Sequence, residues 1–387
     1  MRIPLVVVLG LVALAVSYNQ RMLDPLTSVI ARETGFDVDL VVMLSPAFTL
    51  PYALGQPFLG PIADAIGKAK VLRTSMMMVL AASVGAYFAT SYGALFGWRL
   101  LAGIGAGGII PVGLALIADR TPVERRQVVL SHFMSVAMLG QLYVAPLSAW
   151  ISRHVGWQHN FSLAAVMAAA ALGMLLWKVP PNPGAVRRPF SARAAVATYR
   201  SIVAMPVARV CFATVFAEGI LIFGWLPHVA PYLEQRRLGS ALEAGYILAS
   251  MGVGGLIYGA SVSFLARRFT MFSMMRIGSL AVGAGIAGVA LSPSWQTMAV
   301  AYAAIGLGFY MLHSGIQARV TELRPDARAS CVSLHAFSMF IGVAAGPPVF
   351  GLISGRVGMS ETLAVYAVAM AAAGIAAARF LARSGPA

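Results

Sequence analysis

Three ionisable residues, Asp24, Arg99 and Glu218, interrupt long apolar runs at positions that should lie well inside a lipid bilayer. A fourth, Arg21, stands one helical turn before Asp24. A charged side chain at the centre of a bilayer costs about 2.5–3.5 kcal/mol by insertion measurements, and such residues usually line a path for a substrate or an ion. These positions therefore indicate a protein that moves a solute across a membrane.

Asp24 and Arg99 could together handle a proton. An Arg side chain keeps its charge and needs an anionic partner or water, and Asp24 is the best candidate on the same outer half of the membrane. Burial favours the neutral form of an Asp and a nearby Arg favours the charged form, so Asp24 could load a proton in one state and release it in another. Two alternatives stay open: a static ion pair between two helices, and an ion pair of Asp24 with Arg21 on one helix.

Glu218 lies in the middle of another apolar run, and three roles are open to it. It could bind a cationic group of a substrate, serve as a second proton site, or be a neutral carboxyl in a polar network. His132 and His335 also fall within apolar runs, where a single His is more often an interior hydrogen-bonding residue than a proton relay. The other candidates for a substrate-binding wall are Tyr18, Asn19, Gln141, Tyr143, Trp225, His228, Tyr310, His313 and Gln317.

The elements that must position these residues are membrane-spanning helices. A mean hydropathy of +0.81 with 11% charged residues excludes a soluble globular protein. An apolar stretch of about 20 residues spans a bilayer as a helix, and nothing here alternates apolar with polar residues as the strands of a membrane barrel do. We therefore predict an all-α integral membrane protein with twelve transmembrane helices. The expected helices are 4–32, 39–63, 70–90, 93–119, 125–152, 157–179, 205–233, 239–266, 272–291, 294–321, 328–355 and 358–382.

The net charge of +15 follows membrane topology rather than a nucleic acid. With the N-terminus inside, most of the 28 Lys and Arg fall in loops on that same side, which places both termini in the cytoplasm. A nucleic-acid-binding protein needs basic residues on one soluble face, and we expect no soluble domain. The apolar run after Met1-Arg2 is long and further spans follow it, so we interpret it as the first helix and not as a removed signal peptide.

Other chemistry finds little support in the sequence. Cys211 and Cys331 fall inside expected helices, and their spacing suggests neither a disulfide nor a metal site. Residues 103–108 fit the GxGxxG pattern, but they lie in an apolar helix without the strand that a dinucleotide site requires, and glycines there permit close helix approach. We expect no cofactor and no enzymatic activity, since no metal cluster, nucleophile triad or phosphate loop is present.

The chain consists of two similar halves. The longest polar interruption separates two six-helix bundles, residues 1–179 and 205–387, and residues 180–204 are expected to form a cytoplasmic linker with a short amphipathic helix on the membrane surface. Parallel repeats of this kind place a substrate site near the midplane between them. An offset of 203 residues aligns Gly103 with Gly306, Gly105 with Gly308, Asp119 with Glu322, Pro122 with Pro325, Arg125 with Arg328, His132 with His335 and Ser135 with Ser338.

The loop after the second expected helix carries a family motif. Residues 60–70 read Gly-Pro-Ile-Ala-Asp-Ala-Ile-Gly-Lys-Ala-Lys, which resembles the loop between helices 2 and 3 of the major facilitator superfamily. The resemblance implies a cytoplasmic latch in which Asp64, together with Gly60, Gly67 and Lys68, caps the N-terminus of helix 11 and releases it when the inner gate opens. Ala65 departs from the family pattern, which usually has a basic residue there.

Helix 4 carries a second motif, residues 98–105, in which Arg99 is followed by a Gly-rich stretch. It resembles a motif of the superfamily's proton-coupled members, although Ala102 stands where a Gln is common. The superfamily also implies that helices 1 and 7, with Asp24 and Glu218, face the central cavity.

A third motif occurs in both halves and resembles the antiporter motif of drug:proton exporters. The clearer copy, residues 342–351, contains Gly346 and Pro347, which can bend a helix at a bundle interface and serve a gate. The copy at residues 140–146 has Ala145 in place of the Gly before its proline.

The whole chain thus resembles a twelve-helix transporter of the major facilitator superfamily, closest to its drug:proton antiporter group. The resemblance implies secondary active transport of a small organic molecule across the cell inner membrane by alternating access, with proton-coupled export as the first hypothesis. A proton symporter or a facilitator that imports a nutrient or metabolite is the alternative, followed by a receptor that does not transport. The implied partners are a small-molecule substrate, protons and the lipid bilayer, and members of this family commonly work as monomers.

Overall fold

The computed structural model describes residues 5–121, 123–180 and 192–384, and every regular element among them is a helix. The predicted all-α fold class is therefore confirmed. Contacts between residues divide the chain into two units. The first unit is Met1–Leu23 with Leu44–Ala192, and the second unit is Asp24–Met43 with Arg193–Ala387.

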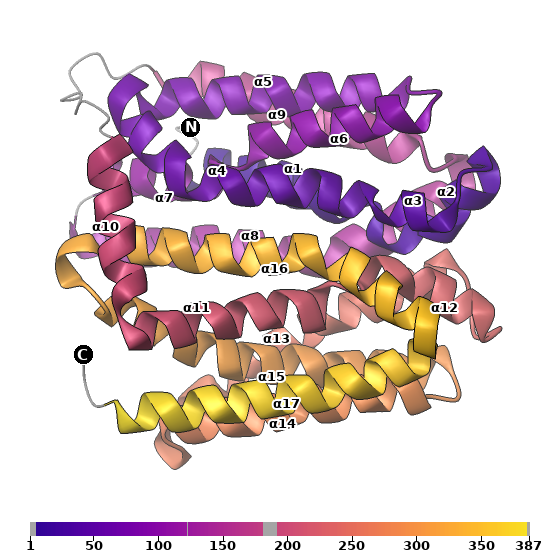
Figure 1. Ribbon diagram of the computed structural model, residues 1–387. Helices are drawn as coiled ribbons and strands as arrows, with labels where there is room; N and C mark the ends of the chain where they lie inside the picture. Colours follow the sequence, from indigo (N-terminus) through magenta and orange to yellow (C-terminus); the bar gives the residue numbers. More distant parts are fainter. Residues whose placement is uncertain (1–4, 122, 181–191, 385–387) are drawn as a thin grey trace. The chain divides into compact units, whose positions relative to one another are not determined.

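The first unit contains seven helices among its described residues. Helix α5 packs against α6 and α9, helix α4 packs against α6, and helix α1 packs against both α8 and α9 (Figure 1). The helices are α1 (Leu5–Arg21), α4 (Leu44–Ile66), α5 (Lys68–Tyr87), α6 (Tyr92–Ala106), α7 (Ile109–Arg120), α8 (Val123–Val155) and α9 (His159–Lys178).

The second unit is built around the neighbouring helices α14 and α15. Helix α14 packs against α15 and α17, helix α13 packs against α15, and helix α11 packs against α16 (Figure 1). Its elements are η1 (Asp24–Leu26), α2 (Thr27–Thr34), α3 (Val38–Val42), α10 (Ala192–Ala204), α11 (Pro206–Glu218), the π-helical η2 (Gly219–Phe223), η3 (Leu226–His228), α12 (Val229–Gln235), α13 (Ala241–Arg268), α14 (Met271–Leu291), α15 (Trp295–Glu322), η4 (Pro325–Ala327), α16 (Arg328–Val357) and α17 (Met359–Arg383).

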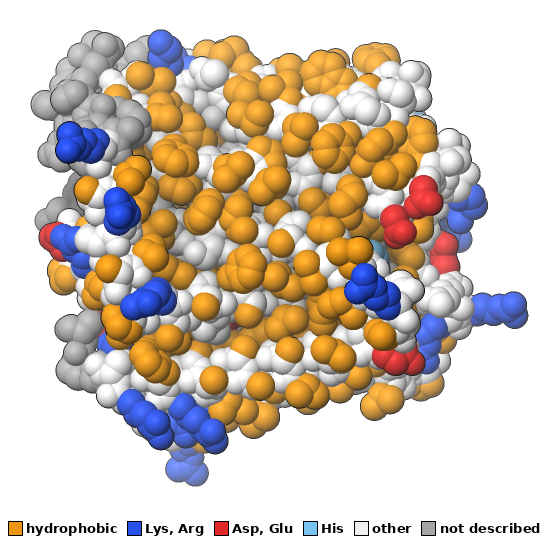
Figure 2. Space-filling model, in the orientation of Figure 1, with side chains coloured by type: hydrophobic (Ala, Val, Ile, Leu, Met, Phe, Trp, Pro, Cys, Tyr) orange, Lys and Arg blue, Asp and Glu red, His pale blue; other side chains and the backbone are white. Residues whose placement is uncertain are grey.

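Eleven helical spans among the described residues are long and apolar enough to cross a membrane. Helix α8, with 33 residues, occupies the place of the predicted helix 125–152, so a total of twelve is consistent with the structure. Hydrophobic side chains cover the middle of the helices on the face shown in Figure 2, while Lys, Arg, Asp and Glu gather towards the helix ends. Such a belt suits contact with the hydrocarbon core of a bilayer.

The predicted helices 4–32 and 205–233 are not continuous. Each contains a short 3-10 turn, at Pro25 in the first and at Pro227 in the second. Proline has no N–H to donate to the preceding turn of a helix, which accounts for the interruptions. Each predicted span is nevertheless found as one stretch long and apolar enough to cross a membrane, Leu5–Thr34 and Pro206–Gln235. The two turns pack together inside the second unit, where the Thr27 hydroxyl donates to the Pro227 carbonyl oxygen at 2.7 Å.

The predicted helix 93–119 is also divided, because α6 ends at Ala106 and α7 begins at Ile109. Its glycines show that the sequence repeat is also a repeat of helix packing. A Cβ on Gly103 of α6 would overlap the carbonyl oxygen of Phe48 in α4, and a Cβ on Gly306 of α15 would overlap that of Met251 in α13. Phe48 and Met251 are themselves 203 residues apart. The same close helix contact is therefore built once in each unit.

Part of the predicted linker is helical. Helix α10 runs across the direction of α11 rather than along it (Figure 1). It buries Ile202, and the Arg324 guanidinium donates to the Ser201 hydroxyl at 2.7 Å. Residues 181–191 of the linker lie outside the described residues.

We expect Gly103→Ala to destabilise the first unit. The new methyl group would force α4 away from α6, and such overpacking costs about 1–3 kcal/mol of unfolding free energy. Thermal unfolding of the purified protein, followed by intrinsic fluorescence, measures the effect. Gly97→Ala is the matched control on the same helix, because nothing lies within 4 Å of a Cβ there. Equal unfolding midpoints for the two variants would contradict the close contact.

Candidate functional site

The second unit joins a carboxyl group and two imidazoles in one chain of contacts. Glu218, the last residue of α11, is fully buried, and its Oε2 lies 2.7 Å from Nδ1 of His313 in α15. Nε2 of His313 lies 3.3 Å from Nε2 of His335 in α16. We call these three residues the Glu–His–His cluster.

Each contact in the Glu–His–His cluster requires a shared proton. A carboxylate only accepts hydrogen bonds, and a neutral imidazole has one donor and one acceptor nitrogen. One proton must therefore lie between Glu218 and His313, and another between His313 and His335. Because His313 uses a different ring nitrogen for each neighbour, the cluster is a line of proton-sharing groups rather than a convergent set of metal ligands. No group of three His, Cys, Asp or Glu among the described residues could hold a metal ion.

Two atoms of the Glu–His–His cluster can take a further proton or partner. Oε1 of Glu218 and Nδ1 of His335 are buried and have no hydrogen-bond partner among the described residues. Leaving a buried polar atom unsatisfied costs about 1–3 kcal/mol, so a further hydrogen-bond partner would be favourable at both atoms. The cluster is an arrangement in which the number of bound protons can change.

A π-helical turn positions Glu218. Helix α11 gives way directly after Glu218 to a π-helix of 5 residues, a form found mostly as single turns at functional sites. A Cβ on Gly219 or Gly224 would collide with α16 at Gly342 or Gly346. Gly219 and Gly224 are five residues apart, whereas Gly342 and Gly346 are four apart. The π-turn is wider than an α-turn, and this lets Gly219 face Gly342 and Gly224 face Gly346. The predicted gate residue Gly346 thus lies where the two chain segments approach closely.

One face of α15 beside the cluster is polar and partly exposed. Tyr310, His313, Ser314 and Gln317 follow the i, i+3, i+4, i+7 spacing of a single helix face, and none of them is buried. The hydroxyl groups of Ser314 and Tyr258 of α13 are 2.7 Å apart. Polar side chains within membrane helices usually face a protein interior or a water-filled path rather than lipid, so this face is suited to solute contact.

The aromatic rings of this region form a continuous series. Tyr258 and Tyr310 lie nearly parallel, with an interplanar angle of 13° and centroids 6.4 Å apart. Phe309 contacts Tyr310 at 5.1 Å and stacks on the His313 ring at 4.9 Å. Phe223 of the π-turn meets Phe309 edge-on at 5.2 Å. The rings therefore connect the exposed face of α15 with the buried cluster.

In the first unit, Arg99 is the centre of a second polar network. It is only 1% exposed, and its guanidinium donates to the carbonyl oxygens of Leu44 and Asn19 at 3.1 Å and 2.6 Å. It also donates to Oδ1 of Asn19 at 3.1 Å and lies 4.7 Å from the ring centroid of Phe48. The close approach of α4 and α6 at Gly103 brings these acceptors within reach.

Two predicted substrate residues belong to this packed network. Asn19 donates to the Ser83 hydroxyl at 2.7 Å besides holding Arg99. Tyr18 is fully buried and donates to Oδ1 of Asn160 at 2.6 Å, which connects α1 with α9. In this structure both residues serve helix packing, and a direct role in substrate binding stays a prediction.

The predicted pairing of Asp24 stays a prediction as well. Asp24 begins the 3-10 turn η1 in the second unit and is 2% exposed, while Arg21 is the last residue of α1 in the first unit. Because a proline and a 3-10 turn follow α1, the two residues do not stand on one continuous α-helix as the sequence spacing implied.

The remaining predicted wall residues are placed as follows. Trp225 is 1% exposed and packs between Tyr302 and Phe350. His228 is also buried, with Nε2 at 3.1 Å from the carbonyl oxygen of Pro347, the predicted gate proline. Tyr143 is partly exposed on α8, and the side chain of Gln141 lies outside the described residues.

The predicted latch residues form an ion-pair cluster at one end of the first unit. The Lys68 ammonium lies 2.9 Å from Asp64 and 2.7 Å from Asp119. Gly67 has a φ of 102°, a backbone conformation that glycine adopts most readily, and a Cβ on Gly60 would meet nothing within 4 Å. Capping of helix 11 by Asp64 stays a prediction.

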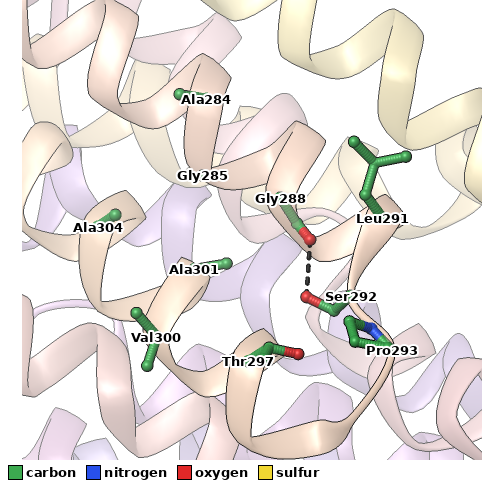
Figure 3. A pocket seen from close by; sticks show the side chains of 10 residues that line it. All are labelled: Ala284, Gly285, Gly288, Leu291, Ser292, Pro293, Thr297, Val300, Ala301 and Ala304. Atoms are coloured by element: carbon green, nitrogen blue, oxygen red, sulfur yellow. Dashed lines mark hydrogen bonds between the residues drawn. The ribbon is translucent and has the colours of Figure 1, made fainter.

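One cavity in the described part of the chain is lined by none of the groups described above. Its volume is about 410 Å³, and Figure 3 shows its ten lining residues on α14, α15 and the turn between them. None of them is charged, the Ser292 hydroxyl donates within the protein to the Gly288 carbonyl oxygen, and Leu291 and Val300 are largely exposed. This cavity is an apolar surface groove and not a continuation of the Glu–His–His cluster.

Sequence reasoning left His335 and Phe309 out of the site. His335 was noticed through its match with His132 and was interpreted as an interior hydrogen-bonding residue, and Phe309 is one aromatic among many. The spacing of Tyr310, His313, Ser314 and Gln317 was a usable signal, because four polar or aromatic residues share one face of an otherwise apolar helix.

Comparisons with known proteins agree with this architecture. The family model described as Major Facilitator Superfamily matches residues 9–294, and the chain belongs to this family of membrane transporters. It is 31% identical over 182 residues to the efflux pump vrtL of Penicillium aethiopicum, covering 44% of this chain and 34% of that protein. It is 27% identical over 275 residues to the inner membrane metabolite transport protein YgcS of Escherichia coli (strain K12), covering 62% of this chain and 60% of that one.

A solved structure extends the comparison to the full fold. The crystal structure of a D-xylose-proton symporter matches 97% of this chain and 96% of its own with a TM-score of 0.74 at 18% identity. The likeness establishes the fold. The aligned segments span about a third to three fifths of the length of the two sequence relatives.

We expect Arg99→Lys to destabilise the protein although the charge is kept. A lysine cannot reproduce the planar fork that reaches Leu44 and Asn19 together, and losing charge-assisted hydrogen bonds costs about 1.5–3 kcal/mol each. Thermal unfolding measures the loss, with Arg153→Lys, at an exposed position of α8, as the control. An Arg99→Lys variant as stable as the control would show that charge alone matters at this position.

Proposed function

We propose that the protein is a proton-coupled transporter that exports a small organic molecule, and that the Glu–His–His cluster carries the proton. The observation that carries the proposal is the enclosed Glu218 carboxyl. Its Oε2 shares a proton with His313, and its Oε1 has no partner in the part of the chain that the structure describes. A proton arriving at this cluster changes its charge without changing its position. In a site of low dielectric constant, a change in charge alters the free energy of burying the cluster.

The cluster connects three helices of the second unit. Glu218, His313 and His335 lie on α11, α15 and α16. A change in protonation therefore alters contacts on all three helices at once, and it can bias one conformation over another by a few kcal/mol. Alternating access then follows from the rocking of residues 1–179 against 205–387.

Of the three roles open to Glu218, proton binding has the best support. A direct contact with a cationic substrate requires an accessible carboxylate, whereas Glu218 is fully buried behind His313. A purely structural carboxyl would be expected to satisfy both oxygens, and Oε1 has no partner among the described residues.

Asp24 is the second carboxyl in the proposal. It is buried in η1 and, with Arg99 and Arg21, forms the proton path that the sequence motifs suggest. Two carboxyl groups in two different environments can respond to protons in different states of the cycle.

Gating and topology complete the proposal. The Asp64–Lys68–Asp119 cluster is the cytoplasmic latch, and Gly346 with Pro347 permits bending of α16. We place the protein as a monomer in the cell inner membrane with both termini in the cytoplasm. The similarity to an efflux pump supports export, and import by symport is the alternative that uses the same proton site.

Replacing Glu218 by Gln tests the proton role. Gln keeps the size and hydrogen-bonding capacity but cannot exchange a proton, so we expect flux driven by a pH gradient in proteoliposomes to fall at least about tenfold, which corresponds to about 1.4 kcal/mol. Substrate exchange without a gradient should persist, because exchange does not require net proton movement.

Glu361→Gln, at an exposed position in the first turn of α17, is the control and should transport normally. Unchanged gradient-driven flux in Glu218→Gln would refute the proton role of the cluster. The sign of the gradient that drives accumulation distinguishes export by antiport from import by symport.

Asp24→Asn tests the second carboxyl in the same vesicles. If Asp24 also carries a proton, the variant should lose gradient-driven flux while the purified protein keeps its unfolding midpoint. Asp39→Asn, near the start of α3, is the control. Intact proton-driven flux in Asp24→Asn would remove Asp24 from the proton path and leave Glu218 as the single proposed carrier.

A further inference from the structure

We infer that the exposed face of α15 and α13 recognises an uncharged planar aromatic compound that bears hydroxyl or carbonyl groups. The inference rests on the proposed function, because it names the substrate class of that transporter. The ring of the substrate would stack on Tyr258 and Tyr310, and its polar groups would bond to Ser314 and Gln317. We call the two parallel rings of Tyr258 and Tyr310 the tyrosine platform.

Three charged groups within the membrane spans are shielded from a solute, whereas Arg21, at the end of α1 in the first unit, is partly exposed. Asp24, Arg99 and Glu218 are each no more than 2% exposed. An organic cation or anion that leaves water needs an accessible opposite charge to offset its desolvation. The groups that the face of α15 and α13 presents are instead hydroxyl groups, one amide and one imidazole, so an uncharged solute suits it best.

The tyrosine platform is a built feature of the helix packing. A Cβ on Gly255 of α13 would collide with the ring of Tyr310, so this glycine is what lets the ring lie against α13 beside Tyr258. The hydroxyl contact between Tyr258 and Ser314 at 2.7 Å restrains the second ring. Parallel rings at 13° offer one continuous aromatic surface, and aromatic partners prefer offset stacking on such a surface.

The polar groups around the platform can both donate and accept hydrogen bonds. Gln317 is exposed one helical turn from Ser314 on the same face, and an amide with neighbouring hydroxyl groups can bond either a hydroxyl or a carbonyl substituent. An apolar hydrocarbon would leave these polar groups without hydrogen-bond partners, which makes its binding less favourable. The face therefore selects for an aromatic ring with polar substituents.

The platform also connects to the proton site. Phe309 touches both Tyr310 and the His313 ring, with centroids 5.1 Å and 4.9 Å away. A substrate that presses on Tyr310 therefore acts on the imidazole that shares the proton of Glu218. Binding and protonation can be coupled through this contact without a charge on the substrate.

The test is a binding experiment on the purified full-length protein in detergent, measured by calorimetry with four matched probes. They are naphthol, its saturated counterpart decalol, naphthoate and naphthylmethylammonium. We expect naphthol to bind at least about tenfold more tightly than the other three, because stacking on an aromatic side chain contributes about 1–3 kcal/mol. Tighter binding of either ionic probe, equal binding of decalol, or binding of none of the four would overturn the inference.

Variants locate the binding on the platform. Tyr310→Leu should weaken naphthol about tenfold, while Tyr310→Phe, which keeps the ring, should stay within about threefold. Tyr246→Leu, an exposed aromatic position elsewhere on α13, is the control and should bind normally. Equal affinities for Tyr310→Leu and Tyr246→Leu would place the binding elsewhere.

The outcome is independent of the proton proposal. Naphthol binding that depends on Tyr310, together with flux that ignores the pH gradient, would support the substrate class and refute proton coupling. Proton-driven flux of a charged probe, in a protein that does not bind naphthol, would support proton coupling and refute the substrate class.

Discussion

An enclosed carboxyl group determines the arrangement of the helices around it. Glu218 cannot stay buried in an apolar bundle without a polar partner, and that partner, His313, comes from α15 rather than from its own helix. For α11, α15 and α16 to meet at this point, the backbone must come close, and glycines on both sides of the α11–α16 contact provide the space. The polar cluster therefore depends on the glycine contacts and on the π-turn, which together bring the three helices close enough to meet.

The two units share a scaffold but differ in chemistry. The glycine contacts of α6 with α4 and of α15 with α13 are equivalent, yet Tyr302 stands 203 residues after Arg99, and the counterpart of His313 is Ile110. The repeat thus preserves helix packing, while each half carries its own polar network. One network surrounds the permanent charge of Arg99, and the other joins a carboxyl group to two imidazoles.

Much of this fold follows from the sequence, because apolar length, charge bias and repeated glycines report directly on membrane spans. The site was harder to predict. Glu218, His313, Tyr310 and Gln317 were selected by residue type and do lie together, but so were Tyr18 and Asn19, which are packed inside the first unit. Residue type does not fix rotation about the axis of a helix that is apolar on all sides. The pairing of His313 with His335 depends on that rotation in two helices at once.

The π-turn after Glu218 also distinguishes the two halves in backbone geometry. A π-turn contains one residue more than the α-turn that it replaces, whereas α1, the corresponding segment of the first half, is α-helical up to Arg21. One extra residue inside an α-helix would rotate everything beyond it by about 100°. The wider turn takes up that residue locally, within the five residues of the π-helix.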